Sequence, residues 1–159
     1  MFDEVRYFTP GNEACVFENA GIQYGLILCE DAWHEGPAKQ AHAAGAQVLL
    51  VMNASPYHLQ KESLRIDILR NQIALTKMPL VYVNAVGGQD ELVFDGGSFA
   101  LNNAGKVVMT MPQFETGLGF VSVNASGDLE QGSMTPPRSV EAQAYQALVL
   151  GVRDYVQKN

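Results

Sequence analysis

The chain has 159 residues, of which 47% are hydrophobic and 17% charged, which suits one modest folded domain with a core and argues against disorder. Its formal net charge of −7 argues against the basic surface that binds nucleic acid or anionic membranes, so a small-molecule ligand is expected. Two cysteines, an N-terminus unlike a signal peptide, and no apolar run near the roughly 20 residues of a membrane span together predict a cytoplasmic protein with reduced thiols.

The first part of the chain alternates strand and helix patterns. The predicted strands are 14–18, 22–29, 47–53 and 79–86, and the predicted helices are 37–44 and 61–77. The later strands are almost wholly apolar, which is typical of strands buried on both faces. The longer helix is amphipathic, with an apolar face of Leu64, Ile68, Leu69 and Ile73. The order strand, helix, strand predicts right-handed crossovers and neighbouring parallel strands, and therefore an α/β fold.

After Gly88 the pattern changes to short strands separated by turns. They are expected at 92–94, 98–101, 107–111 and 118–123, as antiparallel additions at the edge of the same sheet. Residues 124–138 are polar and contain glycine and proline, so they are interpreted as a linker. Ser139 then caps a last helix with an apolar stripe of Tyr145, Leu148, Val149, Val152, Tyr155 and Val156. A linker followed by such a helix predicts the start of a second domain.

Cys29 is the sharpest chemical feature of the sequence. It ends a buried strand of the predicted parallel sheet, where open α/β sheets bind ligands. The turn that follows, from Glu30 to Trp33, can direct backbone N–H groups at a developing oxyanion. The same pattern also fits a small buried hydrophobic residue, which free cysteines often are. Cys15 lies in mid-strand without an evident partner and is assigned no role.

A thiolate needs a base or a cation to activate it, and three histidines are candidates. His34 lies five residues after Cys29, whereas His42 falls on a helix face and His58 in a loop. No spacing singles out one of them, so a Cys-His hydrolase complete within this chain stays open as an alternative. No histidine pair has a metal-ligand spacing supported by cysteine or carboxylate, so no metal is expected.

Two further clusters follow predicted buried strands. In the first, which runs from Asn53 to His58, Ser55 and the nearby Lys61 supply hydroxyl and ammonium donors that could bind a carboxylate. A surface Ser-Pro loop with a lysine at the start of a helix explains these residues equally well. The second cluster, Asp95-Gly96-Gly97-Ser98, is interpreted as a tight structural turn, because neither GxxxxGK[ST] nor GxGxxG occurs.

Four consecutive blocks of the sequence resemble the nitrilase, or carbon–nitrogen hydrolase, superfamily: FDEVRYFTPG, GLILCEDAW, NASPYHLQKESLR and VNAVGGQDELVFDGGSF. Within that superfamily, the four blocks are most similar to the glutaminase domains of glutamine-dependent NAD synthetases. The resemblance implies the second half of an α-β-β-α sandwich with a mixed sheet, and it covers nearly the whole chain. The tail QALVLGVRDYVQKN resembles the helix that opens the ATP-dependent synthetase domain. The expected division is a half glutaminase domain (1–123), a linker (124–138) and the first helix of a second domain (139–159).

The resemblance also implies roles for individual residues. Cys29 matches the nucleophile that attacks the glutamine side-chain amide, and Glu4 matches an acidic residue that helps to orient the site. Glu30 is implicated chiefly through its backbone near the oxyanion. Three residues match positions that line the glutamine pocket: Trp33, Ser55 and Lys61. The serine and the basic residue are expected to recognise the amino-acid end of glutamine.

The family's triad of Glu, Lys and Cys is matched here only at the cysteine. Its lysine would stand just before Phe2, and the lysines at 39, 61 and 77 all follow the nucleophile. We therefore expect this chain alone to be inactive or nearly so, since losing members of a catalytic unit costs many powers of ten in rate. Half a sandwich also leaves a sheet face uncovered, so a homo-oligomer that covers it is expected.

The activity implied for the parent enzyme is glutamine hydrolysis through a γ-glutamyl thioester at Cys29. The ammonia would serve the amidation of deamido-NAD in a domain that requires ATP and Mg²⁺, while this chain itself is expected to hold no cofactor. Glutamine is thus the expected ligand, with no nucleic acid and no membrane. A stand-alone nitrilase-type amidase and a non-catalytic interaction module also stay open.

Overall fold

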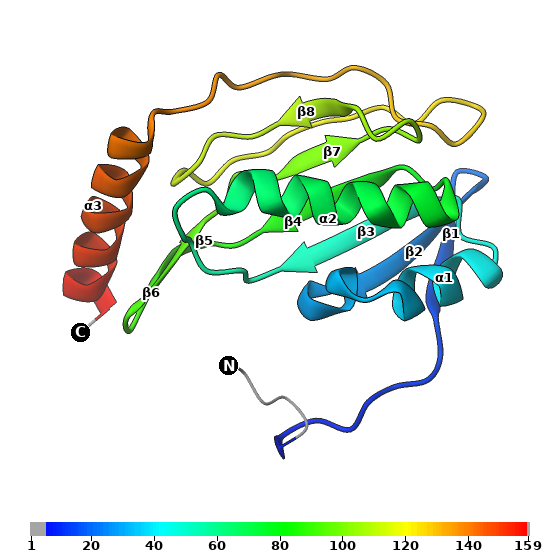
Figure 1. Ribbon diagram of the computed structural model, residues 1–159, viewed down its shortest axis with the longest axis horizontal. Coiled ribbons are helices and arrows are strands. Elements are labelled where there is room, and N and C mark those ends of the chain that lie inside the picture. The colour runs from blue at the N-terminus through cyan, green and yellow to red at the C-terminus, as the bar shows by residue number, and fades with distance from the viewer. Residues whose placement is uncertain (1–5, 159) are drawn as a thin grey trace.

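A six-stranded mixed sheet forms the centre of the computed structural model, which describes residues 6–158 (Figure 1). Its strands, in spatial order, are β1 (Cys15–Asn19), β2 (Ile22–Leu28), β3 (Val48–Asn53), β4 (Leu80–Asn84), β7 (Phe99–Leu101) and β8 (Val107–Thr110). The pairs β2–β3 and β3–β4 are parallel, whereas β1, β7 and β8 are added antiparallel. The α/β class and the mixed sheet predicted from the sequence are confirmed.

Two helices connect the parallel strands and cover one face of the sheet (Figure 1): α1 (Glu35–Ala43) and α2 (Lys61–Thr76). Between helices and sheet lies the main core, which includes Ile27, Leu49, Val51, Leu69, Ile73, Leu80 and Phe99. Helix α1 approaches β2 closely because Gly25 has no side chain; a Cβ there would lie 2.9 Å from the Cβ of Ala41. These contacts hold the helices against the parallel strands whose ends carry the candidate site.

Arg65, rather than Leu64, belongs to the buried face of α2. Leu69 and Ile73 are buried as predicted, but Leu64 is 50% exposed and Arg65 is only 3% exposed. Helical periodicity alone predicts that Leu64, which is apolar, packs in the core. A buried carboxylate described below accounts for the difference, because it pairs with the guanidinium and draws it inward.

The opposite face of the sheet is covered only in part. Residues 112–135 cross it near β8, and Leu129 packs there against Val48 and Met109. At the other end of this face, three side chains that are neighbours in register stay exposed, and we call them the open sheet face: Leu28, Met52 and Val83. They are 55%, 47% and 51% exposed, which is unusual for apolar side chains of central strands.

The predicted strand at 79–86 ends at Asn84, and a separate hairpin follows it. This hairpin consists of β5 (Val86–Gln89) and β6 (Leu92–Asp95), which form their own two-stranded sheet. The prediction that residues 92–94 extend the main sheet was therefore wrong. The chain leaves the main sheet after Asn84, and within β5 Gly87 has a φ of +146°, which is accessible to glycine and rarely to other residues.

The predicted strand at 118–123 is also absent: within this range only Val123 forms a bridge, with Leu129. Instead the chain passes close over two methionines, and a Cβ on Gly119 would lie 2.4 Å from the Sδ atom of Met111. The absence of a side chain at Gly119 allows this close approach. Contact with the methionine side chains takes the place of strand pairing.

Within the polar segment 124–138, residues 131–135 lie along β8 and are hydrogen-bonded to it. The Gly132 N–H donates to the Val108 carbonyl at 2.8 Å, and the Thr110 N–H donates to the Ser133 carbonyl at 3.0 Å. The segment leads to α3 (Val140–Lys158), which stands beside the β5–β6 hairpin (Figure 1). The apolar stripe predicted for this helix faces solvent, and its buried positions are instead Ala147, Leu150 and Asp154.

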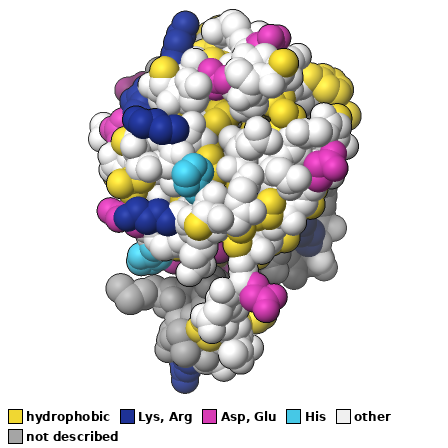
Figure 2. Space-filling model, turned by 90° about the vertical axis from the view of Figure 1, so that its right-hand side faces the viewer, with side chains coloured by type: hydrophobic (Ala, Val, Ile, Leu, Met, Phe, Trp, Pro, Cys, Tyr) yellow, Lys and Arg dark blue, Asp and Glu magenta, His cyan; other side chains and the backbone are white. Residues whose placement is uncertain are grey.

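At the end where β2 and β3 begin, charged side chains lie among apolar ones (Figure 2). The candidate site lies at the opposite end, where these strands finish. Among residues 6–158 no helix combines the length and apolar character that a membrane span requires.

Candidate active site

Cys29 stands at a sharp turn directly after β2. It opens the short 3-10 helix η2 (Cys29–Trp33), and its φ of +43° lies in the left-handed region. The turn is fixed by Asp31, whose Oδ2 accepts a hydrogen bond from the Leu28 N–H at 3.0 Å. A left-handed backbone costs a residue with a side chain about 1–2 kcal/mol, and such strain concentrates at functional sites. The turn leaves the Cys29 thiol partly exposed at the end of the sheet.

The far end of this turn is anchored to α2 by Gln72. The Gln72 side chain is 3% exposed, and its Nε2 donates to the carbonyls of Ala32 at 2.9 Å and His34 at 3.1 Å. These acceptors belong to the last turn of η2 and the residue after it. The position of the turn that carries Cys29 is therefore set by a buried side chain that the sequence did not single out.

A second loop, which begins after β3, places Ser55 in the same pocket as Cys29. The Ser55 N–H donates to Asn84 Oδ1 at 2.8 Å, and the Ser55 carbonyl accepts from Arg65 Nη2 at 2.9 Å and Asn84 Nδ2 at 3.2 Å. Ser55 is 6% exposed. Both backbone groups of this residue are thus satisfied by buried side chains, which makes the loop rigid.

The Arg65 guanidinium forms a bidentate ion pair with Asp95 below this loop. The two N–O distances are 3.1 and 3.0 Å, and the two side chains are only 3% and 2% exposed. Gln113 Nε2 also donates to Asp95 Oδ2 at 3.3 Å, and the Arg65 guanidinium lies 6.0 Å from the centre of the Tyr82 ring. The predicted turn at 95–98 exists, with left-handed φ angles at both glycines, but the ion pair was missed. Its partners lie 30 residues apart, and no local pattern links them.

One pocket of about 540 Å³ joins the two loops. Its lining includes every predicted site residue within the described part of the chain: Cys29, Glu30, Trp33, Ser55 and Lys61. Glu4, the remaining predicted residue, lies outside the described residues. The pocket also contains His58 and two residues of β6 that the sequence analysis did not identify, Leu92 and Phe94. A volume of this size accommodates a small amino acid, and its walls combine apolar surface with a few polar groups.

Lys61 is the cation of this pocket. Its Nζ donates to the Pro56 carbonyl at 3.3 Å. Burial lowers the pKa of Lys61, and the nearby Arg65 lowers it further, while Asp95, Cys29 and Glu30 act in the opposite direction. Lys61 therefore lines the pocket as a partly buried cation with acidic groups nearby.

The histidines differ in their relation to the pocket. His34 is exposed and its Nε2 lies 3.8 Å from Glu30 Oε1 at the surface, and His42 is exposed on α1. His58 lines the pocket but is itself exposed. No hydrogen bond joins the Cys29 thiol to any of the side chains from residue 6 to residue 158. The same part of the chain has no cluster of three or more His, Cys, Asp or Glu side chains suited to a metal ion.

Comparisons of the sequence and of the structure with known proteins all indicate one family. Residues 1–128 match the carbon–nitrogen hydrolase family. Over its whole length the chain is 39% identical to the glutamine-dependent NAD(+) synthetase of Acinetobacter baylyi and 40% identical to that of Rhodobacter capsulatus. It covers 30% and 29% of these two proteins, so the chain spans about a third of the length of the curated relatives it matches.

Solved structures of similar fold include a synthetase and an amidase. The glutamine-dependent NAD+ synthetase from Acinetobacter baumannii, in complex with ADP, matches with a TM-score of 0.90 at 36% identity, over 98% of this chain and 30% of that protein. An amidase from Nesterenkonia matches with a TM-score of 0.59 at 30% identity, over 66% of this chain and 40% of that protein. The nitrilase-type fold predicted from the four sequence blocks is thereby confirmed.

Proposed function

Because this chain belongs to the carbon–nitrogen hydrolase family, we propose that it carries the nucleophile of a glutamine amidohydrolase, Cys29. One observation carries the proposal. The thiol, at a strained left-handed turn, shares a single pocket with Trp33, Ser55 and Lys61, which the sequence resemblance had assigned to glutamine binding. Structural cysteines are usually buried in apolar surroundings, whereas this one opens onto a pocket with a cation nearby.

The reaction that fits this pocket is acyl transfer to sulfur. The Cys29 thiolate attacks the side-chain amide carbon of glutamine, and the C–N bond breaks as the nitrogen takes up a proton and leaves as ammonia. Water then attacks the resulting γ-glutamyl thioester, which releases glutamate and restores the thiol. At the start of η2 the first backbone N–H groups have no partner within the helix, so they can donate to the tetrahedral oxyanion.

The polar groups of the pocket suit the amino-acid end of glutamine. The Lys61 ammonium would bind the α-carboxylate, and the Ser55 hydroxyl would bind the α-amino or carboxylate group. Trp33 is 38% exposed and would cover the aliphatic part of the substrate. Glu4 is proposed to orient the reacting groups, as its match in the family does.

In the parent enzyme the ammonia would be consumed by amidation of deamido-NAD. This proposal is supported by the relatives, which are glutamine-dependent NAD(+) synthetases and are about three times as long as this chain. ATP and Mg²⁺ would be required by that synthetase reaction rather than by the pocket described here. We expect the 159-residue chain alone to turn over glutamine slowly or not at all, since residues 6–158 supply no base bonded to the Cys29 thiol.

A second candidate is an amidase that acts on another small amide. The structural likeness to the Nesterenkonia amidase favours it. The two candidates differ in what the pocket must recognise, since a simple aliphatic amide has no α-carboxylate. Substitution of Lys61 by methionine is therefore expected to weaken the binding of glutamine and to leave that of a simple amide unchanged.

Covalent labelling of Cys29 tests the proposal. The chloroketone analogue of glutamine is expected to alkylate Cys29, glutamine is expected to protect it, and Cys29→Ala should abolish the label. Cys15 is an exposed thiol on β1 and provides the matched control, because Cys15→Ala should leave the labelling unchanged. Labelling that glutamine does not slow, or that is divided equally between the two thiols, would refute the assignment.

A further inference from the structure

The β5–β6 hairpin has two sides, one against α3 and one against the pocket. Directly paired residues of a hairpin share a face. The pair Gly88–Val93 faces α3, since a Cβ on Gly88 would lie 3.1 Å from the Gly151 Cα and a Cβ on Gly151 would lie 3.1 Å from Val93 Cγ2. The alternate residues Leu92 and Phe94 line the pocket that contains the nucleophile. The hairpin is therefore a thin wall between the helix and the substrate site.

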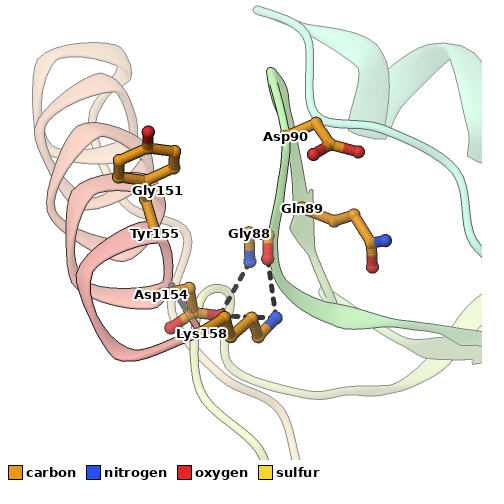
Figure 3. A pocket seen from close by; sticks show the side chains of 7 residues that line it. All are labelled: Gly88, Gln89, Asp90, Gly151, Asp154, Tyr155 and Lys158. Atoms are coloured by element: carbon orange, nitrogen blue, oxygen red, sulfur yellow. Dashed lines mark hydrogen bonds and ion pairs between the residues drawn. The ribbon is translucent and has the colours of Figure 1, made fainter.

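Two side chains of α3 hold this wall by its backbone, as Figure 3 shows. The Gly88 N–H donates to Asp154 Oδ2 at 2.8 Å, and Lys158 Nζ donates to the Gly88 carbonyl at 2.7 Å. The two side chains also pair with each other at 3.5 Å, and Arg153 Nε donates to Asp154 Oδ1 at 3.2 Å. The Gly88 N–H holds the pKa of Asp154 below its ordinary value, so the carboxylate is charged at neutral pH. In the same view Gln89 points away from α3, as the alternation requires.

The hairpin in turn holds the loop that carries the polar part of the pocket. Pro56 and Phe94 form a bridge, and the Tyr57 N–H donates to the Val93 carbonyl at 2.7 Å. The Tyr57 ring and Val93 both pack in the small core that contains Leu150 of α3. Displacement of α3 would therefore move both the apolar wall and the adjoining loop.

We propose that Asp154 and Lys158 are positioning residues that set the width of the substrate pocket through the hairpin. They touch no substrate themselves; they fix Gly88, and the hairpin transmits that position to Leu92 and Phe94. The helix α3 thereby determines how well the pocket discriminates glutamine from other reagents. This inference depends on the proposed function, because the pocket it describes is the proposed glutamine site.

The test compares two rates of Cys29 alkylation in the full-length protein. The chloroketone analogue of glutamine requires the shaped pocket, whereas iodoacetamide reports only the reactivity and accessibility of the thiol. Asp154→Ala removes the acceptor of the Gly88 N–H, whereas Asp154→Asn keeps an acceptor of the same shape. Gly88→Ala adds a methyl group to the hairpin that pushes the hairpin and α3 apart. Gln157→Ala, an exposed position of the same helix, is the matched control.

We expect the ratio of the chloroketone rate to the iodoacetamide rate to fall roughly tenfold in Asp154→Ala and in Gly88→Ala. A tenfold fall corresponds to about 1.4 kcal/mol of lost discrimination between the two reagents. The iodoacetamide rate should stay constant, and Asp154→Asn should recover most of the ratio. A ratio that stays within twofold in both alanine variants would overturn the inference alone, as would a parallel change in both rates, which indicates a merely structural role. If the unaltered protein shows no preference for the glutamine analogue, the proposed function fails and the inference fails with it.

Discussion

Removal of the Asp95 carboxylate is expected to be among the most destabilising single changes in this chain. The carboxylate accepts hydrogen bonds from Arg65 at 3.0 and 3.1 Å and from Gln113 at 3.3 Å. In Asp95→Ala, the Arg65 guanidinium, 3% exposed, keeps only backbone carbonyl acceptors. An unpaired charge in such a place costs about 3–5 kcal/mol. Urea unfolding of the 159-residue chain, followed by circular dichroism, measures this loss.

Two control variants are expected to lose less stability than Asp95→Ala. Asp67→Ala removes the carboxylate of an exposed ion pair with Arg70 on the same helix, so it should cost about 0.5 kcal/mol or less. In the double variant with Arg65→Met and Asp95→Leu no buried charge remains, so the double change should cost less than Asp95→Ala alone. A loss below about 1 kcal/mol for Asp95→Ala, or a double variant that costs the sum of the two single changes, would refute the reasoning.

Four further outcomes are expected. His58→Ala should leave the rate of Cys29 labelling unchanged, and a large fall would favour a Cys-His hydrolase. Cys29→Gly should be more stable to urea than Cys29→Ala by about 1 kcal/mol, because glycine adopts the φ of +43° without strain. The fold lowers the pKa of Asp154 from its ordinary 3.8, so the charged carboxylate stabilises the fold above that pH and this contribution is lost as the pH falls through the folded-state pKa. Urea unfolding should therefore show that the unaltered chain is more stable than Asp154→Asn at neutral pH, and that this difference disappears in acid. Sedimentation should show self-association that weakens when Val83 of the open sheet face becomes lysine.

Short-range patterns were sufficient to predict the main sheet. The runs that became β2, β3 and β4 are largely apolar, which is typical of the central strands of a parallel sheet, although Leu28, Met52 and Val83 on the open sheet face stay exposed. The hairpin and the segment at 118–123 were assigned wrongly because their sequences also fit edge strands. Gly88 lies against α3 and Gly119 lies against Met111, and neither contact can be inferred from the local sequence, because it depends on what approaches the glycine in space.

The candidate site was predictable where the position of a residue follows from a local pattern in the sequence. Cys29 and Ser55 follow apolar strands, so the edge of the sheet that they share could be inferred. The supporting side chains could not, because a buried arginine is recognised only through its distant partner. Asp154 illustrates the same limit: its acceptor role depends on Gly88, 66 residues away along the chain.

Helix α2 connects these supports into one arrangement. Arg65 and Gln72 are seven residues apart, which is two helical turns, so they lie on the same face. Arg65 holds the carbonyl of Ser55, and Gln72 holds the carbonyls at the end of η2. The two loops of the pocket are therefore fixed relative to each other by a single rigid element, and the distance from thiol to Ser55 depends on its geometry. Since α2 also packs against the core through Leu69, a change in the core beneath it is expected to alter the pocket before it unfolds the protein.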